Sequence, residues 1–225
     1  MNILYLIDFN CPYSYIGLER IKKAVANQKL DVEWEMKSFE LEPLTGKASI
    51  GAIDRYAEKF AISSDEVLEK IAEIEKIASD DGLKLSFRDM TLRSSKDAHR
   101  ICKYVQANHP DAMSCLVEKI FHANFVENKN IADNKILKEI AISCGIDEFD
   151  ANKILDNNYY NIEVELDKDE ALIHGITATP CFILTKNEER LIIPGVFSTE
   201  EFETALKDFN DGDVQSKSYG FGGLK

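Results

Sequence analysis

The sequence predicts an α/β protein in which the two ends of the chain build one sheet and a long block of helices is inserted between them. Three observations support this fold class. Residues 3–37 follow a strand–helix–strand pattern, the middle of the chain shows helical periodicity, and residues 181–209 follow a strand–strand–helix pattern. Neither end can complete a sheet alone, so we expect both ends to form it together.

The N-terminal segment predicts two strands around one helix. Residues 3–8 form a short apolar run of strand length, and residues 15–27 place apolar side chains at helical spacing. Val32, Trp34 and Met36 then alternate with charged side chains, as in a strand with one buried face. Such a unit is typical of two parallel strands joined by a crossover helix.

The middle of the chain predicts an insertion made of helices. Ser63 and Glu66 have the spacing of a capping box and precede an apolar stripe. Gly145 closes a later stripe as a C-terminal helix signal. The remaining segments that we interpret as helical are 98–105, 113–125, 136–144, 147–155 and 161–173. Strand signals are nearly absent from this part of the chain.

The C-terminal part predicts a hairpin followed by a last helix. Residues 181–185 and 190–194 are strand-like and flank the polar turn 186–189. Ser198 and Glu201 have the spacing of a second capping box. The predicted domains are residues 1–48 with 175–210, a helical insertion at 49–174 and a Gly-rich flexible tail at 211–225.

The composition argues against several classes of partner. The 27 Lys and Arg residues against 40 Asp and Glu residues leave a formal net charge of −13, which repels nucleic acid and anionic membranes. Apolar residues make up 44% and charged residues 30% of the 225 residues, as in ordinary globular proteins that bury a core without disulfides or metals. No apolar run approaches the ~20 residues of a membrane helix.

The cysteines predict a reducing compartment. The five cysteines are odd in number and scattered, and the N-terminal apolar run lacks the basic start and cleavage site of a secretory signal. We therefore expect free thiols and a cytoplasmic location. Cys102, Cys115 and Cys144 lie on apolar helical stripes, so we interpret them as core residues rather than redox groups.

The strongest chemical signal is a cysteine–proline pair between a strand and a helix. Pro12 lacks an N–H that the first helical position does not need, so it marks Cys11 as the N-cap. The N–H groups and the dipole of the helix start favour an anion, which predicts a lowered pKa for Cys11 and a nucleophilic thiolate. A buried, inert cysteine is the alternative.

A second signal is the pair Thr179-Pro180, which enters the strand at 181–185. A proline at this place is unusual and must sit where the sheet needs no N–H donor. A plain trans proline at the strand start is the simpler interpretation.

These segments together resemble the DsbA-like thioredoxin-fold oxidoreductases, in particular the FrnE-like branch, which is related to the kappa-class glutathione transferases and the hydroxychromene-carboxylate isomerases. The resemblance spans roughly residues 3–209 and rests on 8–17 (DFNCPYSYIG), 39–43 (FELEP), 97–100 (DAHR), 120–125 (IFHANF), 130–133 (NIAD) and 175–182 (GITATPCF). It implies a thioredoxin-like fold with a helical insertion and a cis Pro180 that faces the active-site helix.

The resemblance also implies a thiol–disulfide oxidoreductase or isomerase that acts on peptide or small-molecule thiols. The backbone of Thr179 would pair with an extended substrate, as in strand addition. No cofactor is bound obligatorily, and glutathione is the candidate cosubstrate. The implied catalytic residues are Cys11 and Ser14, and the implied substrate-binding residues are Pro12, Tyr13, Thr179 and Pro180.

Two positions depart from the family pattern. The family usually has a second cysteine where Ser14 stands, so Cys11 lacks a resolving partner in its own motif and should not cycle as a simple dithiol oxidase. Residues 194–197 (PGVF) keep the glycine of the branch's Ser-Gly-Ala-Gln turn but not its polar end. The resemblance therefore does not determine which substrate is chosen.

Ser14 leaves three functions open. An external thiol such as glutathione can resolve a mixed disulfide on Cys11, or Cys11 can isomerise substrate disulfides. Bound glutathione can instead be the working thiol of a transferase or isomerase, with Cys11 or Ser14 stabilising its thiolate. The fold can also serve as a non-catalytic peptide-binding module.

Three further residues have two interpretations each. Cys181 is either an unconventional resolving cysteine or a small core residue on its strand, and we favour the core. His99 and Arg100 either line a cleft between insertion and core or pack on their helix. His99 and Cys102 share a helix face, but two ligands do not make a zinc site, so we predict no metal.

Overall fold

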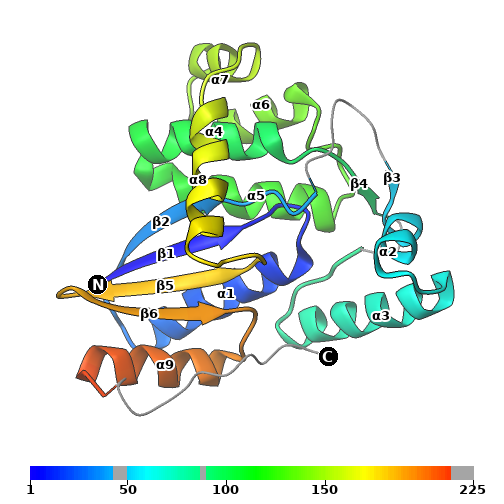
Figure 1. The fold of residues 1–225 in the computed structure, drawn as a ribbon. Helices are drawn as coiled ribbons and strands as arrows, with labels where there is room; N and C mark the ends of the chain where they lie inside the picture. The colour runs from blue at the N-terminus through cyan, green and yellow to red at the C-terminus, as the bar shows by residue number, and fades with distance from the viewer. Residues whose placement is uncertain (43–49, 87–89, 214–225) are drawn as a thin grey trace. The chain divides into compact units, whose positions relative to one another are not determined.

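A computed structural model describes residues 1–42, 50–86 and 90–213. The chain forms two compact units (Figure 1): Met1–Leu41 with Asp167–Lys225, here called the sheet unit, and Glu42–Leu166, here called the helical unit. The sequence analysis set the boundaries at 48/49 and 174/175. Pro43 of the FELEP segment and residues 214–225 of the expected tail lie outside the described residues.

The sheet unit contains one four-stranded sheet in the order β2-β1-β5-β6. Strand β1 (Asn2–Ile7) is parallel to β2 (Glu33–Ser38) and antiparallel to β5 (Cys181–Lys186), which pairs antiparallel with β6 (Glu189–Pro194). The strand–helix–strand and hairpin predictions are therefore confirmed. The central strand pair β1–β5 joins the two ends of the chain. This agrees with the expectation that neither end can complete the sheet alone.

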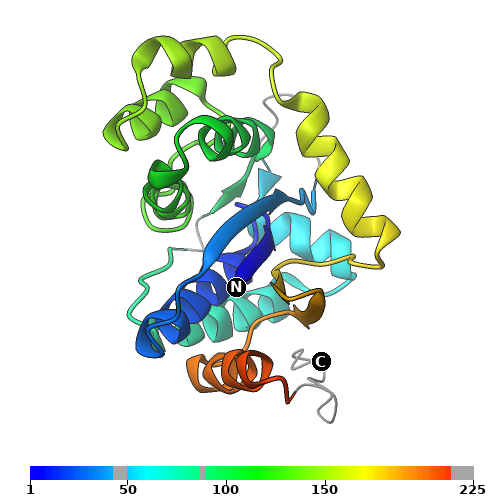
Figure 2. The ribbon, with the colours of Figure 1, turned by 90° about the vertical axis from the view of Figure 1, so that its left-hand side faces the viewer.

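Two helices cover one face of this sheet. Helix α1 (Pro12–Asn27) contacts α9 (Thr199–Asp211), and both helices lie together in Figures 1 and 2. The ring of Phe182 on β5 meets the ring of Phe202 on α9 at a centroid distance of 5.3 Å. On the opposite face, Cys181 and Ile183 pack in a cluster with Ala171 of α8 (Asn161–Ile173). Buried apolar layers thus support both faces of β5.

The β5–β6 turn is tighter than the sequence analysis predicted. Only Asn187 and Glu188 lie between the strands, with φ of 49° and 69°. Two consecutive positive φ angles are typical of a type I′ turn, whose twist matches that of the strands. The flanking lysine and glutamate of the predicted four-residue turn extend the ladder instead.

The helical unit confirms the predicted insertion of helices and adds a small sheet. Its helices are α2 (Ala52–Phe60), α3 (Ser64–Asp80), α4 (Lys96–Asn108), the 3₁₀ turn η1 (Pro110–Ala112), α5 (Met113–Phe125), α6 (Asn134–Ser143), α7 (Glu148–Leu155) and the start of α8. Strands β3 (Ile50–Gly51) and β4 (Thr91–Leu92) pair antiparallel. A strand of two residues is too short to show an alternating pattern, so neither β3 nor β4 was predicted from the sequence.

Local signals at the helix ends are confirmed. Ser63 and Ser198 each accept a hydrogen bond from the N–H three residues on, and Glu66 and Glu201 complete the two capping boxes. Gly145 follows α6 with φ of +87°, a left-handed conformation that glycine adopts without strain. These interactions span at most a few residues, so the sequence alone predicts them.

The expectation of five free thiols is wrong for two cysteines. Cys115 of α5 and Cys144, the C-cap of α6, form a disulfide whose Cα atoms lie 5.8 Å apart. Cys11, Cys102 and Cys181 are free and buried. Apolar periodicity shows which face of each helix is buried, but not which helices meet, so spacing alone did not reveal this pair.

Two properties of the described residues concern membranes and metal ions. No helix among these residues has the length and apolarity to cross a bilayer. The same residues contain no group of three or more His, Cys, Asp and Glu side chains that could hold a metal ion.

Candidate active site

Cys11 occupies the start of α1, as the cysteine–proline signal predicted. It is the N-cap residue, with extended φ and ψ of −98° and 110°, and Pro12 follows at the first helical position. The Cys11 carbonyl accepts a hydrogen bond from the Ser14 N–H at 3.0 Å. Because Pro12 has no N–H to satisfy, the helix begins directly after the sulfur-bearing residue.

The structure brings the two chemical signals of the sequence together. The Thr179–Pro180 peptide bond is cis, the isomer that the family resemblance implied. The Cys11 thiol donates to the Thr179 carbonyl, with Sγ 3.4 Å from the oxygen. The Pro180 carbonyl in turn accepts from the N–H of Gly195 at 2.8 Å, which ties the loop to the end of β6.

Gly17 allows α1 to approach the proline loop closely. A Cβ atom at this position would lie 3.1 Å from Pro180 Cγ and 3.4 Å from the Phe182 ring. Both distances are at or below ordinary van der Waals contact, so a side chain at residue 17 would push the helix away from the loop. The separation between Cys11 and Thr179 therefore depends on glycine at this position.

The other residues of the Cys-Pro-Tyr-Ser motif differ in solvent exposure. Pro12 and Ser14 are buried, whereas Tyr13 is partly exposed. The Ser14 hydroxyl accepts a hydrogen bond from the Asp8 N–H at 3.3 Å. Ser14 is therefore built into the site rather than facing solvent, and Tyr13 is the most exposed residue of the motif.

The predicted lowering of the Cys11 pKa is wrong. Burial raises the pKa of this thiol above its ordinary value, because only 5% of the residue is exposed and the thiolate would lose its hydration. Hydrogen bonds from the side chain and the N–H of Ser14 act in the opposite direction, and the charge of Asp8 adds to the increase. At rest, Cys11 is thus a neutral thiol at neutral pH.

Asp8 is a site residue that the sequence patterns alone did not single out. Its carboxylate is fully buried at the end of β1 and accepts the N–H groups of Asn10 at 3.1 Å and Leu41 at 2.8 Å. These bonds join the loop before Cys11 to the segment that follows β2. An aspartate at the end of an apolar strand was the available signal, since such a carboxylate needs buried donors.

Cys181 belongs to the core in this structure. Side chains alternate along a strand, and the next residue, Phe182, faces α1 and α9. Cys181 therefore points to the opposite face, where it packs with Phe39 and Ile176. Burial raises its pKa to about 11. The Cys181 side chain therefore lies on the sheet face opposite α1.

Arg100 and His99 also have packing roles within the helical unit. The Arg100 guanidinium donates to the carbonyls of Ile154 at 2.6 Å and Tyr159 at 2.7 Å, and pairs with Asp97 at 2.6 Å. It therefore holds the end of α7 and the segment that follows. His99 is fully buried, and burial also raises the pKa of Cys102 on the same helix.

Comparison with known proteins identifies the family. The profile of the DSBA-like thioredoxin domain matches residues 3–207. The chain belongs to this family. An uncharacterized protein of Bacillus subtilis (strain 168), YwbO, is 24% identical over 211 residues, which cover 89% of this chain and 93% of that protein.

Solved structures share the thioredoxin-like DsbA fold. A probable DsbA oxidoreductase from Streptomyces coelicolor has a TM-score of 0.84 and 25% identity, covering 100% of this chain and 98% of that one. A 2-hydroxychromene-2-carboxylate isomerase has a TM-score of 0.68 and 15% identity, covering 97% and 100%. The cytosolic disulfide reductase DsbM from Pseudomonas aeruginosa, solved with GSH, has a TM-score of 0.62 and 14% identity, covering 96% and 100%.

Proposed function

We propose that this protein is a thiol–disulfide oxidoreductase in which Cys11 is the only nucleophile of the motif and an external thiol completes the cycle. The observation that carries the proposal is the position of Cys11 Sγ at the start of α1, 3.4 Å from the Thr179 carbonyl that precedes cis Pro180. Membership of the DSBA-like family supports thiol chemistry at this position.

The proposed cycle has two exchange steps. The Cys11 thiolate attacks one sulfur of a substrate disulfide, forms a mixed disulfide and releases the other substrate sulfur as a thiolate. A small thiol then attacks the substrate sulfur of the mixed disulfide, which restores the Cys11 thiolate and leaves a new disulfide between substrate and small thiol. Ser14 carries a hydroxyl and cannot perform this second step, so the small thiol is required.

The residues around Cys11 reduce the cost of forming its thiolate. The Ser14 side chain and the Ser14 N–H hydrogen-bond to the sulfur, and both lower its pKa against the larger effect of burial. Among the described residues, none pairs with the N–H of Thr179, so this group remains available to a substrate backbone. A substrate that docks there places its disulfide beside Cys11.

Glutathione is the small thiol that we propose, and the cytoplasm is the proposed location. DsbM, a structural neighbour, is a cytosolic disulfide reductase that was solved with GSH. The absence of a second cysteine at position 14 agrees with dependence on an external thiol.

The test measures the reaction of the native protein with oxidised glutathione. We expect one glutathione adduct by intact mass at pH 8, present in the Cys102→Ser control and absent from Cys11→Ser. The raised thiol pKa predicts that adduct formation accelerates steadily from pH 7 to pH 9. Equal modification of wild type and Cys11→Ser would overturn the proposal.

A glutathione-dependent transferase or isomerase is the second candidate. The buried hydroxyl of Ser14 hydrogen-bonds to the Cys11 sulfur and lowers its pKa. The same hydroxyl can donate to the thiolate of a bound glutathione and stabilise it. This candidate predicts saturable binding of reduced glutathione to Cys11→Ser in calorimetry. No detectable heat at millimolar glutathione would count against it.

The low exposure of Cys11 and its raised pKa favour a third candidate, a non-catalytic peptide-binding module. This candidate predicts that neither the thiol adduct nor glutathione binding is observed. Peptide binding that is unchanged by Cys11→Ser would then support it.

A further inference from the structure

The disulfide of the helical unit is a reactive group that the function proposed above does not use. Cys115 is the third residue of α5, and Cys144 directly follows the last residue of α6. Both cysteines are partly exposed, whereas Cys11, Cys102 and Cys181 are buried. The pair is therefore the most accessible sulfur among the cysteines of the described chain.

The two ends of this disulfide lie in different electrostatic surroundings. Cys115 lies in the first turn of α5, at the positive end of the helix dipole, which stabilises a thiolate. Cys144 lies at the C-terminal end of α6, where the dipole has the opposite sign. If the S–S bond breaks, Cys115 is the better leaving thiolate and Cys144 is the sulfur that an incoming thiolate attacks.

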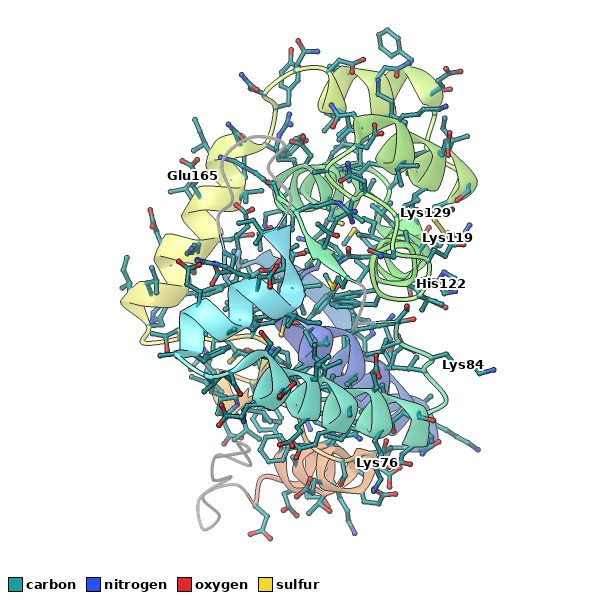
Figure 3. All side chains as sticks on the ribbon, turned by 90° about the vertical axis from the view of Figure 1, so that its right-hand side faces the viewer. Lys76, Lys84, Lys119, His122, Lys129 and Glu165 are labelled. Carbon is teal, nitrogen blue, oxygen red and sulfur yellow. A yellow bond between two sulfur atoms is a disulfide. The ribbon has the colours of Figure 1, made fainter. Side chains whose placement is uncertain are left out.

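A lysine links the two helices that carry the disulfide. Lys119 lies one turn after Cys115 on α5, and its Nζ donates to the carbonyl and hydroxyl of Ser143 at 3.1 Å and 2.9 Å. Ser143 is the neighbour of Cys144, so the ammonium spans from the helix of one cysteine to the helix of the other. Figure 3 labels Lys119 with His122 and Lys129, three basic side chains of this unit in a protein with a net charge of −13.

Apolar packing also joins the two helices that carry the bond. Helices α5 and α6 contact each other, and Leu116, Leu137 and Ala141 of these helices are fully buried. Apolar burial of this kind persists when a partly exposed disulfide opens. The bond can therefore exchange within the folded helical unit.

We propose that Cys115–Cys144 is a second thiol–disulfide exchange site, whose reductant is a small anionic thiol of the glutathione class. The thiolate attacks Cys144 Sγ, breaks the S–S bond, forms a mixed disulfide on Cys144 and leaves the negative charge on Cys115 Sγ. A second thiolate attacks the small-molecule sulfur of that mixed disulfide and releases Cys144 as a thiolate. Two small thiols are oxidised to one disulfide, and their two protons pass to the two cysteines.

The test uses Cys11→Ser, so that failure of the Cys11 chemistry does not affect the result. The folded variant is equilibrated in glutathione buffers of increasing reduced fraction, quenched by alkylation and measured by intact mass, with circular dichroism in parallel. We expect both cysteines to become alkylatable while the helical signal is retained, and the trapped mixed disulfide to map to Cys144. A bond that opens only after denaturant is added, or an adduct on Cys115, would overturn the proposal.

Lys119→Gln provides the electrostatic test. An ammonium about 4 Å from a charge in water contributes about 1 kcal/mol, or about fivefold in rate. We expect this variant to slow reduction by glutathione about fivefold relative to reduction by cysteamine, a cationic thiol. Glu118→Gln on the same helix turn is the matched control and should not slow glutathione. Equal rates for Lys119→Gln and the parent protein would contradict the assigned role of the lysine.

Discussion

Ser14→Ala isolates the contribution of one hydroxyl to the reactivity of Cys11. The hydroxyl hydrogen-bonds to the sulfur and lowers its pKa, opposing the effect of burial. A hydrogen bond to a charged group contributes about 1.5–3 kcal/mol, which corresponds to about one to two pKa units. Removing it should raise the Cys11 pKa further by up to that amount, while the hydrogen bond from the Ser14 N–H remains.

The expected rate change is smaller than the change in thiolate population. A thiolate of higher pKa is also more nucleophilic, and a Brønsted coefficient near 0.5 offsets about half of the lost population. We therefore expect Ser14→Ala to slow alkylation of Cys11 by about three- to tenfold below its titration range. The variant should also lose about 1–3 kcal/mol of stability, because the buried Asp8 N–H loses its acceptor.

The assay follows iodoacetamide incorporation at Cys11 by peptide mass from pH 7 to pH 10. Ser38→Ala is the matched control, because Ser38 is also fully buried in the sheet unit and its hydroxyl has no hydrogen-bond partner among the described residues. The control should react at the wild-type rate. A wild-type rate that reaches its plateau below pH 8, or a rate unchanged in Ser14→Ala, would refute the reasoning.

Three further predictions follow from single contacts. Gly17→Ala should lower the free energy of unfolding by up to about 2 kcal/mol in urea titration, because about 1–3 kcal/mol of crowding against Pro180 exceeds the ~1 kcal/mol gain in helix propensity. Arg100→Met should lower the free energy of unfolding by about 2–4 kcal/mol in the same assay, since buried carbonyls lose their donor. An unchanged free energy would contradict the packing role of Arg100. Stability should fall above about pH 8.5, because the unfolded Cys11 thiol ionises before the folded one, and Cys11→Ala should flatten this slope by up to about 1.4 kcal/mol per pH unit.

Much of the site was predictable because its signals are local. Pro12 marks the helix start, and the structure has Cys11 at the N-cap. Thr179-Pro180 enters a strand of the sheet, and the strand–helix–strand order of the N-terminal segment predicts the parallel β1–β2 pair. The family signatures extended this reasoning, because they place the proline loop opposite the helix start without a calculation of packing.

The direction of the Cys11 pKa shift was not predictable in the same way. The helix start favours a thiolate, and the sequence shows that effect alone. Burial depends on side chains that are distant along the chain, such as Thr179, and it has the larger effect on the sulfur. Asp8 adds its charge from a position whose buried donors include Leu41, a residue on another segment.

The sequence by itself determined the four strands of the sheet unit, the helical character of the insertion, the two capping boxes, the pairing of both chain ends in one sheet and the identity of the thiol at the first helix. Most of these properties depend on contacts within a few residues or on the periodicity of apolar side chains, and the joint sheet follows because neither end can complete a sheet alone. Only the tertiary structure decided that Cys11 is a buried neutral thiol, that Cys181 belongs to the core and that Cys115 is bonded to Cys144. The physical reason is that desolvation and disulfide pairing depend on which surfaces meet in space, and spacing along the chain does not contain that information.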